Sequence, residues 1–94
     1  MNITGNITNG LKVSAGIVTF SDDVVFTGAA ANVTWDKSTD DLIFNDNAQA
    51  KFGTGGDLSI YHDASNSYIK EAGTGQLVIQ GDNLINPRGG FARI

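Results

Sequence analysis

The chain has 94 residues, a formal net charge of −4 and no cysteine, which excludes disulfides and thiolate metal sites. So short a chain forms one domain at most and is marginally stable alone, so self-association is the expected source of further stability. Its six basic residues do not form a stripe, and no apolar run reaches the roughly 18 residues of a membrane span. The sequence therefore predicts neither nucleic-acid binding nor a membrane segment.

The composition favours short strands joined by tight turns. Glycine accounts for 12 residues and proline for one, and Asn, Asp, Thr and Ser fill much of the remainder. No window of helical length carries a helical apolar period, and the best helical fragments, residues 28–31 and 48–51, are too short to stand alone. We expect an all-β protein of short antiparallel hairpins that form a small β-sandwich or a trimeric β-prism.

The first 20 residues differ from the rest because Lys12 is their only charge. Apolar residues fall at odd positions up to Ile17, and after Gly16 the parity shifts, which predicts a bulge or bend there. We expect residues 1–20 to be an extended docking arm that adds a strand to a neighbouring protein, and residues 21–94 to be a β-hairpin repeat domain. One side of the arm would carry its apolar residues, which are Ile3, Ile7, Leu11, Val13 and Ile17.

Three units of similar design follow the arm. Each has an apolar residue, a polar turn and then a Leu-x-(Ile or Phe) triplet, with turns at residues 36–41, 53–57 and 70–76. This pattern predicts three hairpins of differing turn length. The inward residues of the units would form the core or a subunit interface, and they are Trp35, Leu42, Phe44, Phe52, Leu58, Ile60, Ile69, Leu77 and Ile79.

Residues 60–69 read Ile-Tyr-His-Asp-Ala-Ser-Asn-Ser-Tyr-Ile, between a glycine turn at 53–57 and the Gly-Thr-Gly run at 73–75. This stretch resembles a repeat in tail-fibre and other virion structural proteins of tailed phages, above all those of marine cyanobacteria. The similarity covers roughly residues 16–86. It implies a structural role in the virion and often a trimeric fibre, and it implies no catalytic residue. Many copies of the repeat have glycine at the position of Ala64.

The resemblance leaves the position on the particle open among fibre, tail and capsid. It also leaves open whether the chain is a small virion protein in its own right or a segment of a longer fibre.

His62 and Asp63 are the strongest candidates for chemistry. Neighbours on a strand point to opposite faces, which is poor geometry for a carboxylate that orients a histidine. We therefore expect a turn histidine that bonds locally, with no catalytic residue. In a trimer, three copies of His62 could meet on the axis around a metal, but the His-x-His pair usual for such sites is missing. No metal or cofactor site is predicted.

Two further runs suggest ligands and are better explained as turns. Residues 36–41 offer alternating oxygen ligands, but Asp41 and Asn47 stand where a calcium loop needs Gly and Glu. Residues 45–47 are interpreted in the same way. The glycines of residues 53–57 follow a strand without the lysine and helix of a phosphate loop, so they predict a hairpin turn.

These observations favour a non-enzymatic virion structural protein, a fibre, tail or capsid-decoration component, that assembles as a homotrimer and docks to other virion proteins through its arm. The alternative is a receptor-binding module that recognises host surface polysaccharide. A small hydrolase is disfavoured because no nucleophile, base and orienting group come together. The two functions place the aromatic residues differently. The favoured function buries them in a core or interface, whereas the alternative exposes them for binding. These residues are Trp35, Phe44, Phe52, Tyr61 and Tyr68.

Overall fold

The computed structural model describes residues 4–83 and, within that range, contains six β-strands and no helix. The predicted all-β class is therefore confirmed. No helix in this range is long and apolar enough to cross a membrane. The strands are β1 (Val24–Phe26), β2 (Val33–Asp36), β3 (Asp41–Phe44), β4 (Ala50–Phe52), β5 (Leu58–His62) and β6 (Ser67–Glu71).

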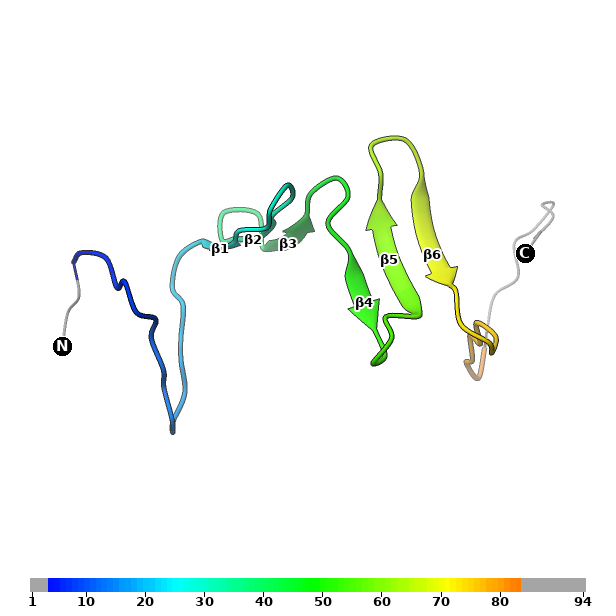
Figure 1. The fold of residues 1–94 in the computed structure, drawn as a ribbon, viewed down its shortest axis with the longest axis horizontal. Coiled ribbons are helices and arrows are strands. Elements are labelled where there is room, and N and C mark those ends of the chain that lie inside the picture. Colours follow the sequence, from blue (N-terminus) through cyan, green and yellow to red (C-terminus); the bar gives the residue numbers. More distant parts are fainter. Residues whose placement is uncertain (1–3, 84–94) are drawn as a thin grey trace.

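The strands form two antiparallel sheets of three strands each, in the orders β1-β2-β3 and β4-β5-β6. Within each sheet, each strand pairs with the next one in the chain, and the first sheet (β1–β3) and the second sheet (β4–β6) follow one another along the long axis (Figure 1). Trp35 lies opposite Leu42, and Phe52 lies opposite Leu58. The first two predicted hairpins are thus confirmed, with the residues that flank each turn paired across it.

The third predicted hairpin is wrong. Ile69 lies in β6, but residues 77–79 belong to no strand, so Leu77 and Ile79 are not paired with β6. The chain leaves the sheet just after β6, where the Ala72 N–H donates to the Asp57 carbonyl. A Cβ atom on Gly73 would stand 2.8 Å from carboxylate oxygens of both Asp57 and Glu71. Because Gly73 has no side chain, the backbone can pass close to these two carboxylates as it leaves the sheet.

The connections are tight turns of the kinds that their residues favour. Gly53 and Gly56 have φ values of 97° and 68° in the β4–β5 turn, which confirms that these glycines serve a hairpin. Asp40 closes the β2–β3 turn with a φ of 57°. Asn47, between the two sheets, has a φ of 71°, and its N–H donates to the His62 carbonyl over 2.8 Å. The link between the sheets is therefore fixed to the end of β5.

The segment from residue 4 to residue 23 contains no strand, and each of its residues is exposed. The expected bend is present, since residues 15 and 16 form a bend and Gly16 has a φ of 92°. Ile7, Leu11, Val13 and Ile17 all lie in this exposed segment, whereas Ile3 lies outside the described residues. The docking role of the arm stays a prediction.

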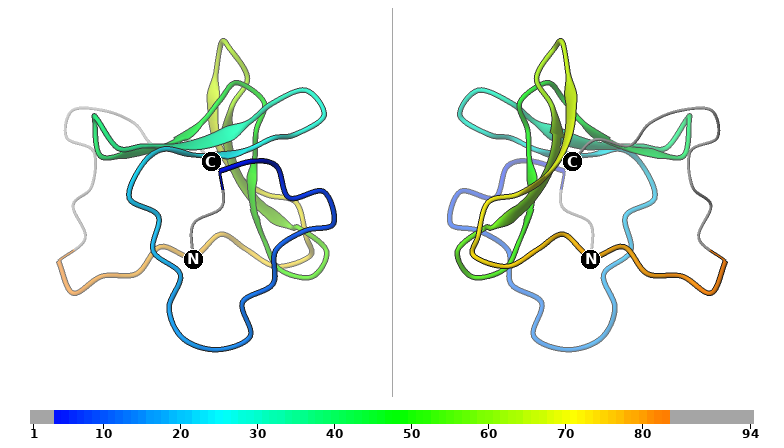
Figure 2. Two further views of the ribbon diagram at one scale, coloured as in Figure 1. Left: turned by 90° about the vertical axis from the view of Figure 1, so that its left-hand side faces the viewer. Right: turned by 90° about the vertical axis from the view of Figure 1, so that its right-hand side faces the viewer.

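The molecule is elongated, with extents of 57 × 31 × 31 Å. Its radius of gyration is 18.5 Å, whereas a compact domain of this length would have one of about 12 Å. Along the long axis, the chain winds around the centre of the view, and the two sheets form two differently inclined sides (Figure 2). The sheets thus do not close onto each other in one chain.

Hardly any residue is buried. Among the described residues, only Ala48 and Ser59 count as buried, at 8% and 6% exposure. The chain exposes 8648 Å², against about 5,200 Å² for a compact monomer of its mass. The single chain therefore lacks a hydrophobic core, and the predicted inward residues do not form one.

A substitution at Gly28 tests the close backbone packing of the loop before β2. A Cβ atom there would lie 2.1 Å from the Ala31 carbonyl oxygen, and the Gly28 N–H donates to the Asn32 side chain. We expect Gly28→Ala to lower the free energy of unfolding by about 1–3 kcal/mol, because backbone has to move. Gly75→Ala is the control, since a Cβ there meets nothing within 4 Å. Urea denaturation measures both, and equal stability of the two variants would contradict the structure.

A substitution at Ala64 tests the backbone conformation of the β5–β6 turn. It has a φ of 79°, so an alanine adopts the left-handed conformation that glycine favours. We expect Ala64→Gly to raise the free energy of unfolding by about 1 kcal/mol. Ala50→Gly, within β4, should lower it by a similar amount. A loss of stability in Ala64→Gly would show that the turn does not need this conformation.

Candidate functional site

The register of the first sheet places apolar residues together on one side. Side chains alternate along a strand, and residues paired across strands share a face. The pairs Val24 with Trp35, and Val33 with both Phe26 and Phe44, fix this face. We call it the apolar face of the first sheet, and it consists of Val24, Phe26, Val33, Trp35, Leu42 and Phe44.

The second sheet has a matching face. Ile60 lies between Ala50 on β4 and Ile69 on β6, and Leu58 lies opposite Phe52. The ends of this face are polar, with the pair His62 and Ser67 at one end and Glu71 at the other. The apolar face of the second sheet consists of Ala50, Phe52, Leu58, Ile60 and Ile69.

Both apolar faces are uncovered in the single chain. Phe26 is 62% exposed and Ile69 is 61% exposed, although each lies at the position that a sheet normally buries. Phe44 from the first sheet lines the same hollow, of about 730 Å³, as Ile60 and Ile69 from the second. Phe44 therefore opens onto the same space as the apolar face of the second sheet.

His62 and Ser67 lie at the rim of this hollow. The His62 Nδ1 atom is 2.8 Å from the Ser67 Oγ atom across β5 and β6. Asp63 is turned to the loop, where one carboxylate oxygen accepts the N–H groups of Asn66 and Ser65. The bond from Asn66 has the larger effect and the bond from Ser65 the next, and both hold the pKa of Asp63 below its usual value. The carboxylate therefore caps the turn, and the histidine bonds locally, as predicted.

The acidic run at residues 36–41 is also a turn. One oxygen of Asp36 accepts bonds from the side chain and the N–H of Ser38, and these bonds lower the pKa of Asp36. The Lys37 N–H donates to Asp23, which ties the turn to the segment before β1. Residues 45–47 turn in the same way, with the Ala48 N–H donating to the Asn45 carbonyl. Within residues 4–83, three potential acidic, histidine or cysteine ligands of a metal do not come together.

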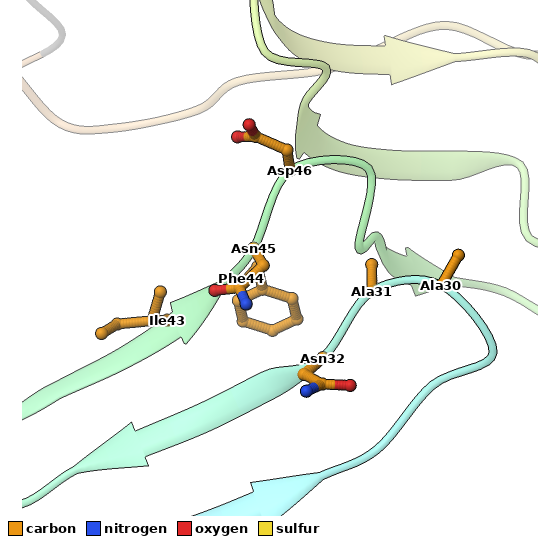
Figure 3. A pocket seen from close by; sticks show the side chains of 7 residues that line it. All are labelled: Ala30, Ala31, Asn32, Ile43, Phe44, Asn45 and Asp46. Atoms are coloured by element: carbon orange, nitrogen blue, oxygen red, sulfur yellow. The ribbon is translucent and has the colours of Figure 1, made fainter.

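A further hollow, of about 550 Å³, lies between the loop before β2 and the end of β3 (Figure 3). Ala30, Ala31 and Asn32 line it on the loop side, and the Phe44 ring lies between the loop and the strand. Asp46 is the only titratable residue in its lining. This arrangement supplies packing surface and no reactive pair.

The structure places seven of the nine predicted core or interface residues on the two apolar faces, and leaves Leu77 and Ile79 off them. The aromatic residues are divided, because Tyr61 and Tyr68 pair on the opposite face of the second sheet. Sequence reasoning missed four members of the faces, although the apolar run Val-Val-Phe at residues 24–26 was a usable signal for a strand. The missed residues are Val24, Phe26, Val33 and Ala50.

Comparison of the chain with protein-family models, with curated proteins and with solved structures gives no match.

The lowered pKa of Asp63 predicts how stability depends on pH. A carboxyl group whose folded pKa is depressed contributes stability above its unfolded pKa, near 3.8, and loses it as the pH falls through the folded value. We expect Asp63→Asn to melt below the wild type at pH 7, and the gap to close as the pH falls below 3.8. Thermal melts monitored by circular dichroism across this range test it. A gap independent of pH would contradict the capping role.

Proposed function

We propose that the protein is a non-enzymatic structural component of a phage virion that assembles as a homotrimer. The observation that carries the assembly is the pair of uncovered apolar faces, with Phe44 of the first lining the same hollow as Ile60 and Ile69 of the second. A virion location and the number three are what the resemblance of residues 52–80 implies. The arm at residues 1–20 docks to other virion proteins in this proposal, because the apolar residues within its described part, residues 4–20, are exposed and this part belongs to no strand.

The amount of exposed surface supports an obligate assembly. The chain exposes 8648 Å², about 3,400 Å² more than a compact monomer of its mass would. Standard pairwise interfaces remove about 800 Å² from each partner, and obligate assemblies remove far more. Burial of apolar surface is the main favourable term in association, so covering both faces would stabilise each chain considerably.

The path of the chain supports a prism with the apolar faces inward. The two sheets lie on different sides of the long axis (Figure 2), and neither folds back onto the other. In a trimer, copies of the two sheets would close around the axis and supply for each other the core that one chain lacks. The role is mechanical, since shared burial gives the assembly a stability that the chain does not have alone.

The test is native mass by light scattering. We expect about three times the 9.9 kDa of one chain at micromolar concentration. Phe44→Ser should lower this mass, because Phe44 lies on an apolar face and lines the shared hollow. Ile43→Ser is a matched control, since Ile43 is the preceding residue of β3, is 38% exposed against 39% for Phe44, and points to the other face.

A monomeric wild type would overturn the proposal, as would equal loss of mass in the two variants. Deletion of residues 1–20 distinguishes the contribution of the arm to assembly from that of the apolar faces. A trimer that survives this deletion places assembly in the sheets and leaves the arm for docking, whereas a monomer after deletion would show that the arm holds the copies together.

A further inference from the structure

The arm contains the dipeptide Asn9-Gly10, which is the only Asn-Gly pair in the chain. Between two strands, such a pair typically forms a two-residue hairpin turn. Here residues 4–23 contain no strand, residues 8 and 9 form a bend, and the part of the arm that contains them lies clear of both sheets (blue in Figure 1). The pair therefore does not serve a hairpin, and no sheet holds its backbone.

An asparagine followed by glycine can react with its own main chain. The nitrogen of the following residue bonds to the asparagine Cγ atom and closes a succinimide ring, while the Cγ–Nδ2 bond breaks and the N–H proton leaves with the ammonia. Water then adds to one carbonyl of the ring and opens it, which gives aspartate or isoaspartate. The net reaction consumes water, releases ammonia and oxidises nothing. This lability is one reason why asparagine is scarce in heat-stable proteins.

The structure leaves this reaction unobstructed at Asn9. Gly10 has a φ of 88°, and a Cβ atom built on it would meet nothing within 4 Å. Asn9 and its neighbours are exposed, so water reaches both the attacking nitrogen and the attacked carbon. No main-chain carbonyl within residues 4–83 accepts the Gly10 N–H. The nitrogen therefore breaks no main-chain hydrogen bond when it attacks.

Other asparagines in the described part of the chain are held or crowded. The side-chain oxygen of Asn32 accepts the Gly28 N–H over 3.1 Å, and the side chain of Asn66 donates to the Tyr68 hydroxyl over 3.4 Å. Every asparagine in residues 4–83 except Asn9 is followed by a residue with a side chain, which crowds the ring that must close.

Asn6 gives the closest internal comparison. It lies three positions before Asn9 in the same exposed segment, and the β-branched Ile7 follows it. Branching at Cβ restricts the rotation and the access that ring closure needs. Both asparagines meet the same solvent, so a difference in their rates isolates the effect of the residue that follows.

We propose that Asn9 is a site of spontaneous deamidation through a succinimide. Lys12 carries the only side-chain charge of residues 1–20, so the new carboxylate lowers the side-chain charge of the arm from +1 to zero. The isoaspartate product also lengthens the main chain by a methylene group, which would shift the register of any strand formed there. Because the site lies outside both sheets, the inference goes beyond the proposed function and does not depend on the trimer.

The experiment incubates the full chain at mildly alkaline pH, where base removes the amide proton more readily. Trypsin then cleaves after Lys12, so tandem mass spectrometry follows Asn6 and Asn9 in one peptide. We expect Asn9 to convert at least about tenfold faster than Asn6, with isoaspartate among its products.

Two single substitutions exchange the residues that follow the two asparagines. Gly10→Val should slow conversion of Asn9 by about tenfold or more, because it places a β-branched side chain beside the ring. Ile7→Gly is the matched variant, and it should bring the rate at Asn6 to within about threefold of that at Asn9. Both positions are exposed and outside the sheets, so circular dichroism should show the same fold in both variants.

Four results would overturn the inference. They are the absence of conversion at Asn9 in the purified chain, equal rates at Asn9 and Asn6, an unchanged rate in Gly10→Val, and conversion to aspartate without isoaspartate. The last result would show direct hydrolysis of the side-chain amide, because a succinimide opens at either carbonyl.

Discussion

The structure depends on one constraint: a strand places successive side chains on opposite faces, so each of these sheets has one apolar side that water disfavours. Three short strands cannot curl far enough to cover that side themselves. A second sheet could do so by packing face to face, but here the two sheets succeed one another along the long axis (Figure 1). The apolar sides therefore stay uncovered within one chain.

Local features of the fold were predictable because they depend on short stretches of chain. The polar run after Trp35 fixes a turn that pairs Trp35 with Leu42, and the glycines after Phe52 do the same for Leu58. The third unit has the same pattern and still does not pair. Ile69 pairs instead with Ile60 of β5, and the Ala72 N–H extends this pairing by donating to the Asp57 carbonyl. A repeat in sequence thus predicts a hairpin only where the contacts around its turn are also repeated.

The candidate site was predictable in part for the same reason. Alternation identifies which residues of one strand share a face, and it placed Phe44, Phe52 and Ile60 correctly on apolar faces. It does not reveal which strands are neighbours. Lys51 and Lys70 are 19 positions apart and become neighbours in one row only through the register of β4, β5 and β6. Non-local pairing of this kind has no signal in the composition or in any single window.

The two faces of the second sheet assign different tasks to adjacent residues. Leu58 and Ile60 lie on the apolar face of the second sheet, while Ser59 and Tyr61 lie on its opposite face. Because the backbone separates the two sides, a substitution on one face leaves the contacts of the other largely unchanged.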